Sequence, residues 1–166
     1  MWAYVVQKWT LRNGNELSAT VNAAGKIVYL ESDWNGSADA TGCDLADLRF
    51  GTTSLGDLRR RFGSNGFAFK GRGGVLTTPD GVVMINSYDA VGVLATFFTK
   101  VNGTTGESKN SAPVADHAKL DALSIADAEY AKSEWGNASM TRTTRKLNGS
   151  DSPSLGEPCV VGDKSP

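Results

Sequence analysis

The chain has 166 residues, of which 40% are hydrophobic and 21% charged, values typical of globular proteins that argue against wholesale disorder. Its formal net charge of -1 argues against a dedicated nucleic-acid-binding protein, which carries a basic excess to neutralise phosphates. No stretch approaches the roughly 18 consecutive apolar residues of a transmembrane helix, so we expect no membrane span.

The first 34 residues alternate between apolar and polar side chains, as strands do. Residues 3–11 and 16–22 flank Asn13 and Gly14, a pair typical of the turn of a β-hairpin. Gly25 then predicts a second turn, followed by a third strand over residues 26–32. This segment is therefore predicted to form a three-stranded antiparallel sheet.

Helical signals follow a small, polar loop at residues 35–43. Residues 44–50 are compatible with a short helix, and residues 54–62 predict a better one. In the second helix Ser54 and Asp57 have the spacing of a capping box, and Gly63 stands where a left-handed C-cap belongs. The two helices together predict a helical hairpin, with the arginines at 59–61 on a solvated face.

Strands are predicted again at residues 67–70, 82–88 and 93–101, with glycine turns between them. Residues 127–136 resemble the helix at 54–63, because each ends in an aromatic residue followed by glycine. Residues 137–166 are polar and turn-rich, and we expect a disordered tail there.

Two pairs of turn glycines indicate an internal repeat. Gly14 and Gly25 are 11 residues apart, as are Gly81 and Gly92, and each member of the second pair stands 67 positions after its counterpart. The apolar register of the flanking segments agrees at that offset, which favours a duplicated unit over chance. Because the helical hairpin precedes its sheet, the first copy would begin partway through a unit at Met1, and an uncovered sheet face could promote self-association.

The predicted fold class is therefore a two-layer α+β fold, in which a helical hairpin packs on an antiparallel sheet, in tandem repeat with the first unit truncated. The predicted divisions are the sheet half of a first repeat at 1–34, a complete repeat at 35–101, a linker and C-terminal helix at 102–136, and a disordered tail at 137–166.

The stretch from Phe50 to Gly63, with the strands behind Gly81 and Gly92, resembles the helical hairpin and sheet of the beta-lactamase inhibitory protein family. It is also similar to the small outer-membrane lipoproteins of the barrel-assembly machinery. The resemblance covers residues 44–101, with a partial copy at 2–34. It implies a periplasmic or secreted protein-binding module without catalytic activity, and it carries over no contact residue. Two features depart from the pattern: no lipobox cysteine stands near Met1, and Cys43 lacks a nearby second cysteine.

Few residues offer catalytic chemistry. The single histidine, His117, lies in a polar segment without neighbours that would tune its pKa, so a surface role is favoured. Glu31 and Asp33 share one face of a predicted strand, and paired acids on an edge strand more often deter strand pairing than hydrolyse a substrate. Cys43 and Cys159 show no metal-binding spacing, and whether they pair is left open. No cofactor or metal is predicted, and the N-terminus lacks the features of a signal peptide.

Aromatic residues in or beside the predicted strands are the natural candidates for a protein interface. Strand side chains alternate between faces, so some of these aromatic residues must face outward. We expect Tyr4, Trp34 and Tyr88 to contribute to such a surface. The predicted function is a non-enzymatic protein-binding module with an unidentified partner. The alternatives are a structural or oligomeric assembly protein and a hydrolase with a dispersed carboxylate site.

Overall fold

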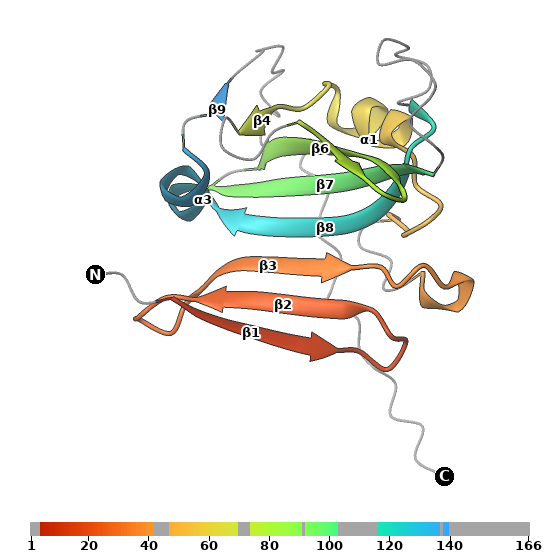
Figure 1. The fold of residues 1–166 in the computed structure, drawn as a ribbon. Helices are drawn as coiled ribbons and strands as arrows, with labels where there is room; N and C mark the ends of the chain where they lie inside the picture. The colour runs from red at the N-terminus through yellow and green to blue at the C-terminus, as the bar shows by residue number, and fades with distance from the viewer. Residues whose placement is uncertain are drawn as a thin grey trace.

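The computed structural model describes residues 4–41, 47–69, 74–90, 92–102, 116–136 and 138–139. Its main feature is one seven-stranded antiparallel sheet with the strand order β1-β2-β3-β8-β7-β6-β5 (Figure 1). The strands are β1 (Val5–Thr10), β2 (Glu16–Val21), β3 (Ile27–Asp33), β5 (Val75–Thr78), β6 (Gly81–Ala90), β7 (Val93–Asn102) and β8 (Lys119–Asp127). The other elements are the 3-10 helix η1 (Ala38–Ala40), the helices α1 (Leu55–Phe62) and α3 (Ala128–Trp135), and a two-stranded pair of β4 (Ala68–Phe69) with β9 (Ala138–Ser139).

The position of β8 shows that the predicted fold class is wrong. Two consecutive three-stranded segments, β1 to β3 and β5 to β7, do form, but β8 lies between them and pairs with both β3 and β7. Ile125 of β8 lies opposite Leu30 on one side and opposite Ala95 on the other. The two segments are therefore parts of one sheet in a mostly-β fold. They are not tandem units that each combine a helical hairpin with a sheet.

No helical hairpin forms in the described residues around α1. Residues 47–50, predicted as part of its first helix, are turns: Asp47 has a φ of 66°, outside the helical region, and the amide of Arg49 donates to the Thr53 hydroxyl at 2.8 Å. Residues 42–46 of that predicted helix lie outside the described residues. Leu48 and Phe50 are nevertheless buried, so this turn contributes to the core without being helical.

Helix α1 is confirmed, together with both of its predicted caps. The Ser54 hydroxyl accepts from the amide of Asp57 at 3.1 Å, and the Asp57 carboxylate accepts from the amide of Ser54 at 2.9 Å. Gly63 ends the helix with a φ of 65°. Leu55 and Leu58 are fully buried, because their spacing places them on the face that meets the sheet.

Two apolar clusters lie against the sheet. The larger cluster joins α1 and the 47–50 turn to β6, β7 and β8, and its buried members include Tyr88, Phe97 and Leu120. The smaller one lies under α3 and includes Leu94 and Ala126. Figure 1 shows both helices beside β6, β7 and β8, while the described residues place no helix over β1 and β2.

Helix α3 is confirmed where it is predicted, and its N-cap is Asp127, whose side chain accepts from the amides of Glu129 and Tyr130. Of the predicted disordered tail, only residues 138 and 139 are described, and they pair with β4. Residues 137 and 140–166 lie outside the described residues.

The packing of α1 gives a direct test of this core. Leu58→Ala should lower the free energy of unfolding by about 2 to 5 kcal/mol, because Leu58 is fully buried and its removal leaves a cavity. The matched control is Leu76→Ala on β5, whose side chain is largely exposed and should cost less than about 1 kcal/mol. Denaturant titration followed by circular dichroism measures both, and equal effects would contradict this placement of α1.

Candidate functional site

The outer edge of β1 is the most distinctive surface of the described chain. β1 lies at the end of the sheet and pairs, among the described residues, only with β2. At the hairpin, the amide of Leu11 donates to the carbonyl of Asn15 at 2.8 Å. Hydrogen-bonded and non-hydrogen-bonded pairs alternate along an antiparallel ladder, so the N–H and C=O groups of Val6, Lys8 and Thr10 point away from β2. These groups form an open hydrogen-bonding edge.

Large apolar side chains accompany this edge. Val5, Val6 and Trp9 are 57%, 61% and 45% exposed, which is unusual for three such residues on one six-residue strand. Val5, Gln7 and Trp9 share the sheet face on which α1 packs. Residues opposite each other in neighbouring strands point to the same face, and a row of such partners runs from Gln7 through Ala19, Leu30, Ile125 and Ala95 to Tyr88. Lys8 points to the opposite face. The apolar face of the sheet therefore continues beyond the core to its edge.

The hairpin end of β1 is fixed by a network of asparagines. Asn15 is buried, and its side-chain amide donates to the carbonyl of Ala40 at 2.9 Å while its oxygen accepts from the amide of Asn35 at 3.1 Å. Asn35 in turn donates from its side chain to the carbonyl of Asn13 at 2.9 Å. Gly14 has a φ of 83°, which suits the tight turn between these contacts. The turn is thus attached to the segment that follows β3.

The other end of β1 is fixed by aromatic packing. Tyr4 meets Tyr130 of α3 edge-to-face, with ring centroids 5.2 Å apart. Tyr130 also lies 6.1 Å from Tyr29 and 6.4 Å from Trp135, so the start of β1 joins a cluster of four aromatic rings. β1 is therefore held at both ends, while no described strand pairs with its outer edge.

The opposite edge strand, β5, is a natural comparison. It has four residues, and Val75 and Leu76 are exposed. The amide of Ile85 donates to the carbonyl of Gly74, so these two residues form a hydrogen-bonded pair. Hydrogen-bonded and non-hydrogen-bonded pairs alternate along the strand, so Val75 and Thr77 are non-hydrogen-bonded, and the amide of Thr77 points away from β6. β5 thus offers a shorter open edge among the described strands. Thr77 corresponds to Lys8, because each has an amide that points outward from the middle of its edge strand.

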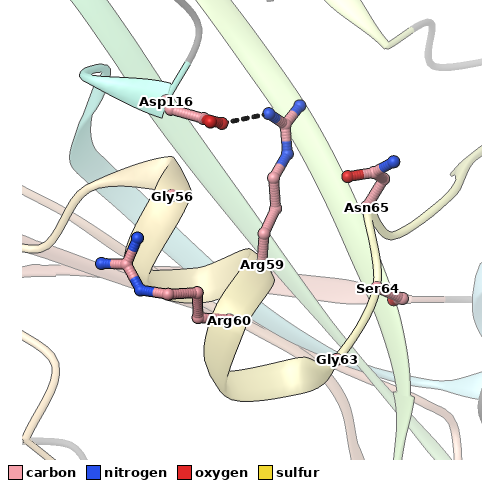
Figure 2. Close-up of a pocket in the computed structure, with 7 residues that line it drawn as sticks. All are labelled: Gly56, Arg59, Arg60, Gly63, Ser64, Asn65 and Asp116. Carbon is pink, nitrogen blue, oxygen red and sulfur yellow. Dashed lines mark hydrogen bonds and ion pairs between the residues drawn. The ribbon is translucent and has the colours of Figure 1, made fainter. Parts of the chain in front are cut away.

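A shallow polar depression lies beside α1 (Figure 2). Figure 2 shows Arg59 reaching from the helix to an ion pair with Asp116, while Arg60 points to the other side, where it pairs with Asp57. Gly56 permits this approach, because a Cβ there would come within 3.2 Å of the carbonyl oxygen of Asp116. Both of these arginines are paired with carboxylates, and the residues lining the depression include neither a histidine nor a cysteine. Among the residues that line it, Asp116 is the one carboxylate, and it is paired with Arg59, so the depression does not hold the pair of carboxylates typical of glycoside hydrolysis.

Two half-buried carboxylates lie near the end of β3. Burial raises the pKa of Asp33, and the charges of Glu16 and Asp121 raise it further against a smaller opposing effect of Lys8. Burial likewise raises the pKa of Asp121. The sequence singled out Asp33 together with Glu31, and neither Asp33 nor Asp121 lines either of the two depressions beside α1. Among the described residues, no group of three His, Cys, Asp or Glu side chains is arranged to hold a metal ion.

The three aromatic residues predicted to bind a partner lie in different places. Tyr88 is only 5% exposed beneath α1; its hydroxyl donates to the carbonyl of Ser64, and burial raises its pKa to about 12. Trp34 is half-buried and packs against Gly51, while its indole N–H donates to the carbonyl of Ser37 at 3.0 Å. Tyr4 is half-buried against Tyr130. The structure does not bring them together on one surface.

Trp9 and Val5 are exposed, but the sequence did not identify them as interface residues. Their alternation with polar residues was visible as a strand, but that pattern does not reveal that β1 would be an edge. The pairing of β8 with β3 places β3 inside the sheet, and not at the edge predicted from Glu31 and Asp33, which leaves β1 as the edge strand at this end.

Comparisons with protein-family models, curated proteins and solved structures find no match for this chain. The resemblance to the beta-lactamase inhibitory protein family therefore stays a prediction. Within the described residues, no helix combines the length and apolar character needed to cross a membrane.

The raised pKa of Asp33 predicts a pH-dependent effect of its replacement. The raised pKa of Asp33 means that the folded protein disfavours the ionised form of this carboxyl. The protonated carboxyl therefore makes its full contribution to stability below the pKa of the unfolded chain, and this contribution is lost as pH rises through the higher pKa of the folded protein. Asp33→Asn should therefore stabilise the fold at neutral pH, by less than about 1 kcal/mol after solvent screening, and have little effect near pH 3.

Asp57→Asn is the control, because its expected effect on stability at neutral pH is opposite to that of Asp33→Asn. Hydrogen bonds from Ser54 lower the pKa of Asp57, so its stabilisation is present at neutral pH and is lost as pH falls through the lowered value. Asp57→Asn should lower the melting temperature at pH 7 and not in strong acid. Thermal denaturation over a range of pH measures both variants, and effects of the same sign at pH 7 would contradict this assignment.

Proposed function

We propose that this protein binds polypeptides by adding an extended segment to the free edge of β1. The observation that carries the proposal is the combination of outward-pointing main-chain groups at Val6, Lys8 and Thr10 with exposed Val5 and Trp9 beside them. In strand addition the main-chain hydrogen bonds supply affinity, and contacts with alternate side chains supply specificity. β1 offers both.

The contacts at its two ends support a binding role for β1. A strand that is already ordered loses less conformational entropy when a partner binds. The Asn15 network holds the hairpin end and the Tyr4–Tyr130 contact holds the other end, so β1 is ordered before any partner arrives. This differs from an edge strand that must fold on binding.

The side chains of β1 define the kind of segment it suits. Val5 and Trp9 lie on the face of the sheet shared with α1, and Lys8 and Thr10 lie on the other. A complementary segment has apolar residues on alternate positions facing Val5 and Trp9, and on the other face a mixture of apolar and polar residues opposite Val6 and Lys8, without a cation directly opposite Lys8. The proposal is thus binding of an extended, amphipathic strand.

Lys8→Pro tests the proposal. Proline removes the outward amide of Lys8 but leaves the hydrogen bonds from β1 to β2 intact, since these are made by Val5, Gln7 and Trp9. Peptides would be selected from a random displayed library against the immobilised chain, at a density that keeps the copies apart. The dissociation constants of the selected peptides should rise at least about tenfold for Lys8→Pro, because a main-chain hydrogen bond is lost and the proline ring obstructs the partner.

Thr77→Pro is the matched control, because it removes an outward amide from the other edge strand. It should leave the dissociation constants unchanged. Circular dichroism and thermal denaturation of both variants show whether the sheet persists. Peptides that bind Lys8→Pro as tightly as the unchanged chain would exclude strand addition at β1. A library that yields no binder would exclude foreign peptides as the partner of this edge.

A further inference from the structure

We infer that the strand added to β1 is β1 of a second copy, in an antiparallel, two-fold arrangement centred on Gln7. The inference rests on the proposed function, since it names the partner for the same edge. Pairing of two β1 strands would join the two seven-stranded sheets into one continuous sheet, through an interface made of the same surface on both copies.

The direction of the main-chain groups limits the possible registers. Val6, Lys8 and Thr10 present their N–H and C=O groups outward, so each must lie opposite one of the same three residues in the partner strand. Two of the allowed symmetric registers give the longest overlap of β1 with itself. In one, Gln7 faces Gln7 of the second copy; in the other, Lys8 faces Lys8.

Charge decides between these registers. With Lys8 on the axis, two ammonium groups lie directly opposite each other on one face, which destabilises a strand pair. With Gln7 on the axis, Lys8 lies opposite Val6 and the two lysines are separated. The two Gln7 side chains can then hydrogen-bond to each other, because each amide carries both a donor and an acceptor.

The Gln7 register also matches the apolar side chains. It places Val5 of each copy opposite Trp9 of the other, on the face that continues into the core. An aromatic ring opposite a β-branched side chain is a favourable cross-strand pair. Trp9 already lies opposite Leu17 within its own chain, so the added Val5 extends an existing apolar row. In this register the amides of Val6 and Lys8 make four hydrogen bonds across the axis.

The register predicts a charge-dependent oligomeric state. Size-exclusion chromatography with light scattering at micromolar concentrations should give twice the mass of one chain for the unchanged protein. Gln7→Glu and Gln7→Lys should each give the monomer mass, because either change places two like charges on the axis. An equimolar mixture of the two variants should restore the double mass as a mixed dimer, identified by native mass spectrometry with one variant tagged.

Two controls separate this edge from the rest of the surface. Thr77→Glu places a charge on the β5 edge and should leave the double mass unchanged. Lys8→Gln removes the charge from β1 and should preserve the dimer, because Lys8 does not lie on the axis. Circular dichroism of every variant confirms that a monomer mass does not reflect loss of folding.

The outcomes distinguish this inference from the proposed function. A monomeric unchanged chain whose selected peptides still lose affinity in Lys8→Pro would overturn the dimer and leave strand addition standing. A dimer that persists in both Gln7 variants would overturn the register and place the interface elsewhere. Larger assemblies abolished by Thr77→Pro would instead show β1 pairing with β5 of the next copy, which also overturns the two-fold arrangement.

Discussion

The pairing of β8 with both β3 and β7 is the constraint on which the rest of the structure depends. It joins segments that are far apart in the chain, since Leu30 and Ala95 both lie opposite Ile125. Most of its buried positions are small, since Ala122, Ser124 and Ala126 accompany the one larger buried residue, Leu120. The backbone ladder fixes the spacing of neighbouring strands, so these small residues, together with the buried Ser87–Thr96 hydroxyl pair of β6 and β7, limit how far the side chains of this sheet face project.

The same strand also positions α1. At the start of β8, the carbonyl of Ala118 accepts from the amide of Leu55, and Leu120 exchanges backbone hydrogen bonds with Gly51 and Thr53. These contacts attach both the 47–53 turn and the first turn of the helix to β8, so the helix meets the sheet over β6 to β8. The helix is thereby placed away from β1 and β2, and β1 keeps its exposed Val5, Val6 and Trp9.

Features determined by neighbouring residues were predictable from the sequence. The turn at Gly14, the capping box of Ser54 and Asp57, and the C-cap at Gly63 all depend on local chemistry, and all are present. β8 was missed because alanine and serine have low strand propensity and its partners are distant in the chain. That one omission also produced the wrong repeat architecture and concealed the internal position of β3, which follows from strand order and not from any local pattern.

The composition of β1 gives the open edge its significance. Edge strands are usually protected by proline, by bulges, by several charges or by shortness. β1 has six residues, no proline, one lysine and an uninterrupted register with β2, whereas the pairing of β2 with β3 is irregular near Val21. Lys8 disfavours the register that has Lys8 on the two-fold axis, but not the register that has Gln7 there. The single charge of Lys8 therefore selects one register for self-pairing without preventing self-pairing. An edge with such a charge is specific for one partner strand and register, and it is not protected against strand addition.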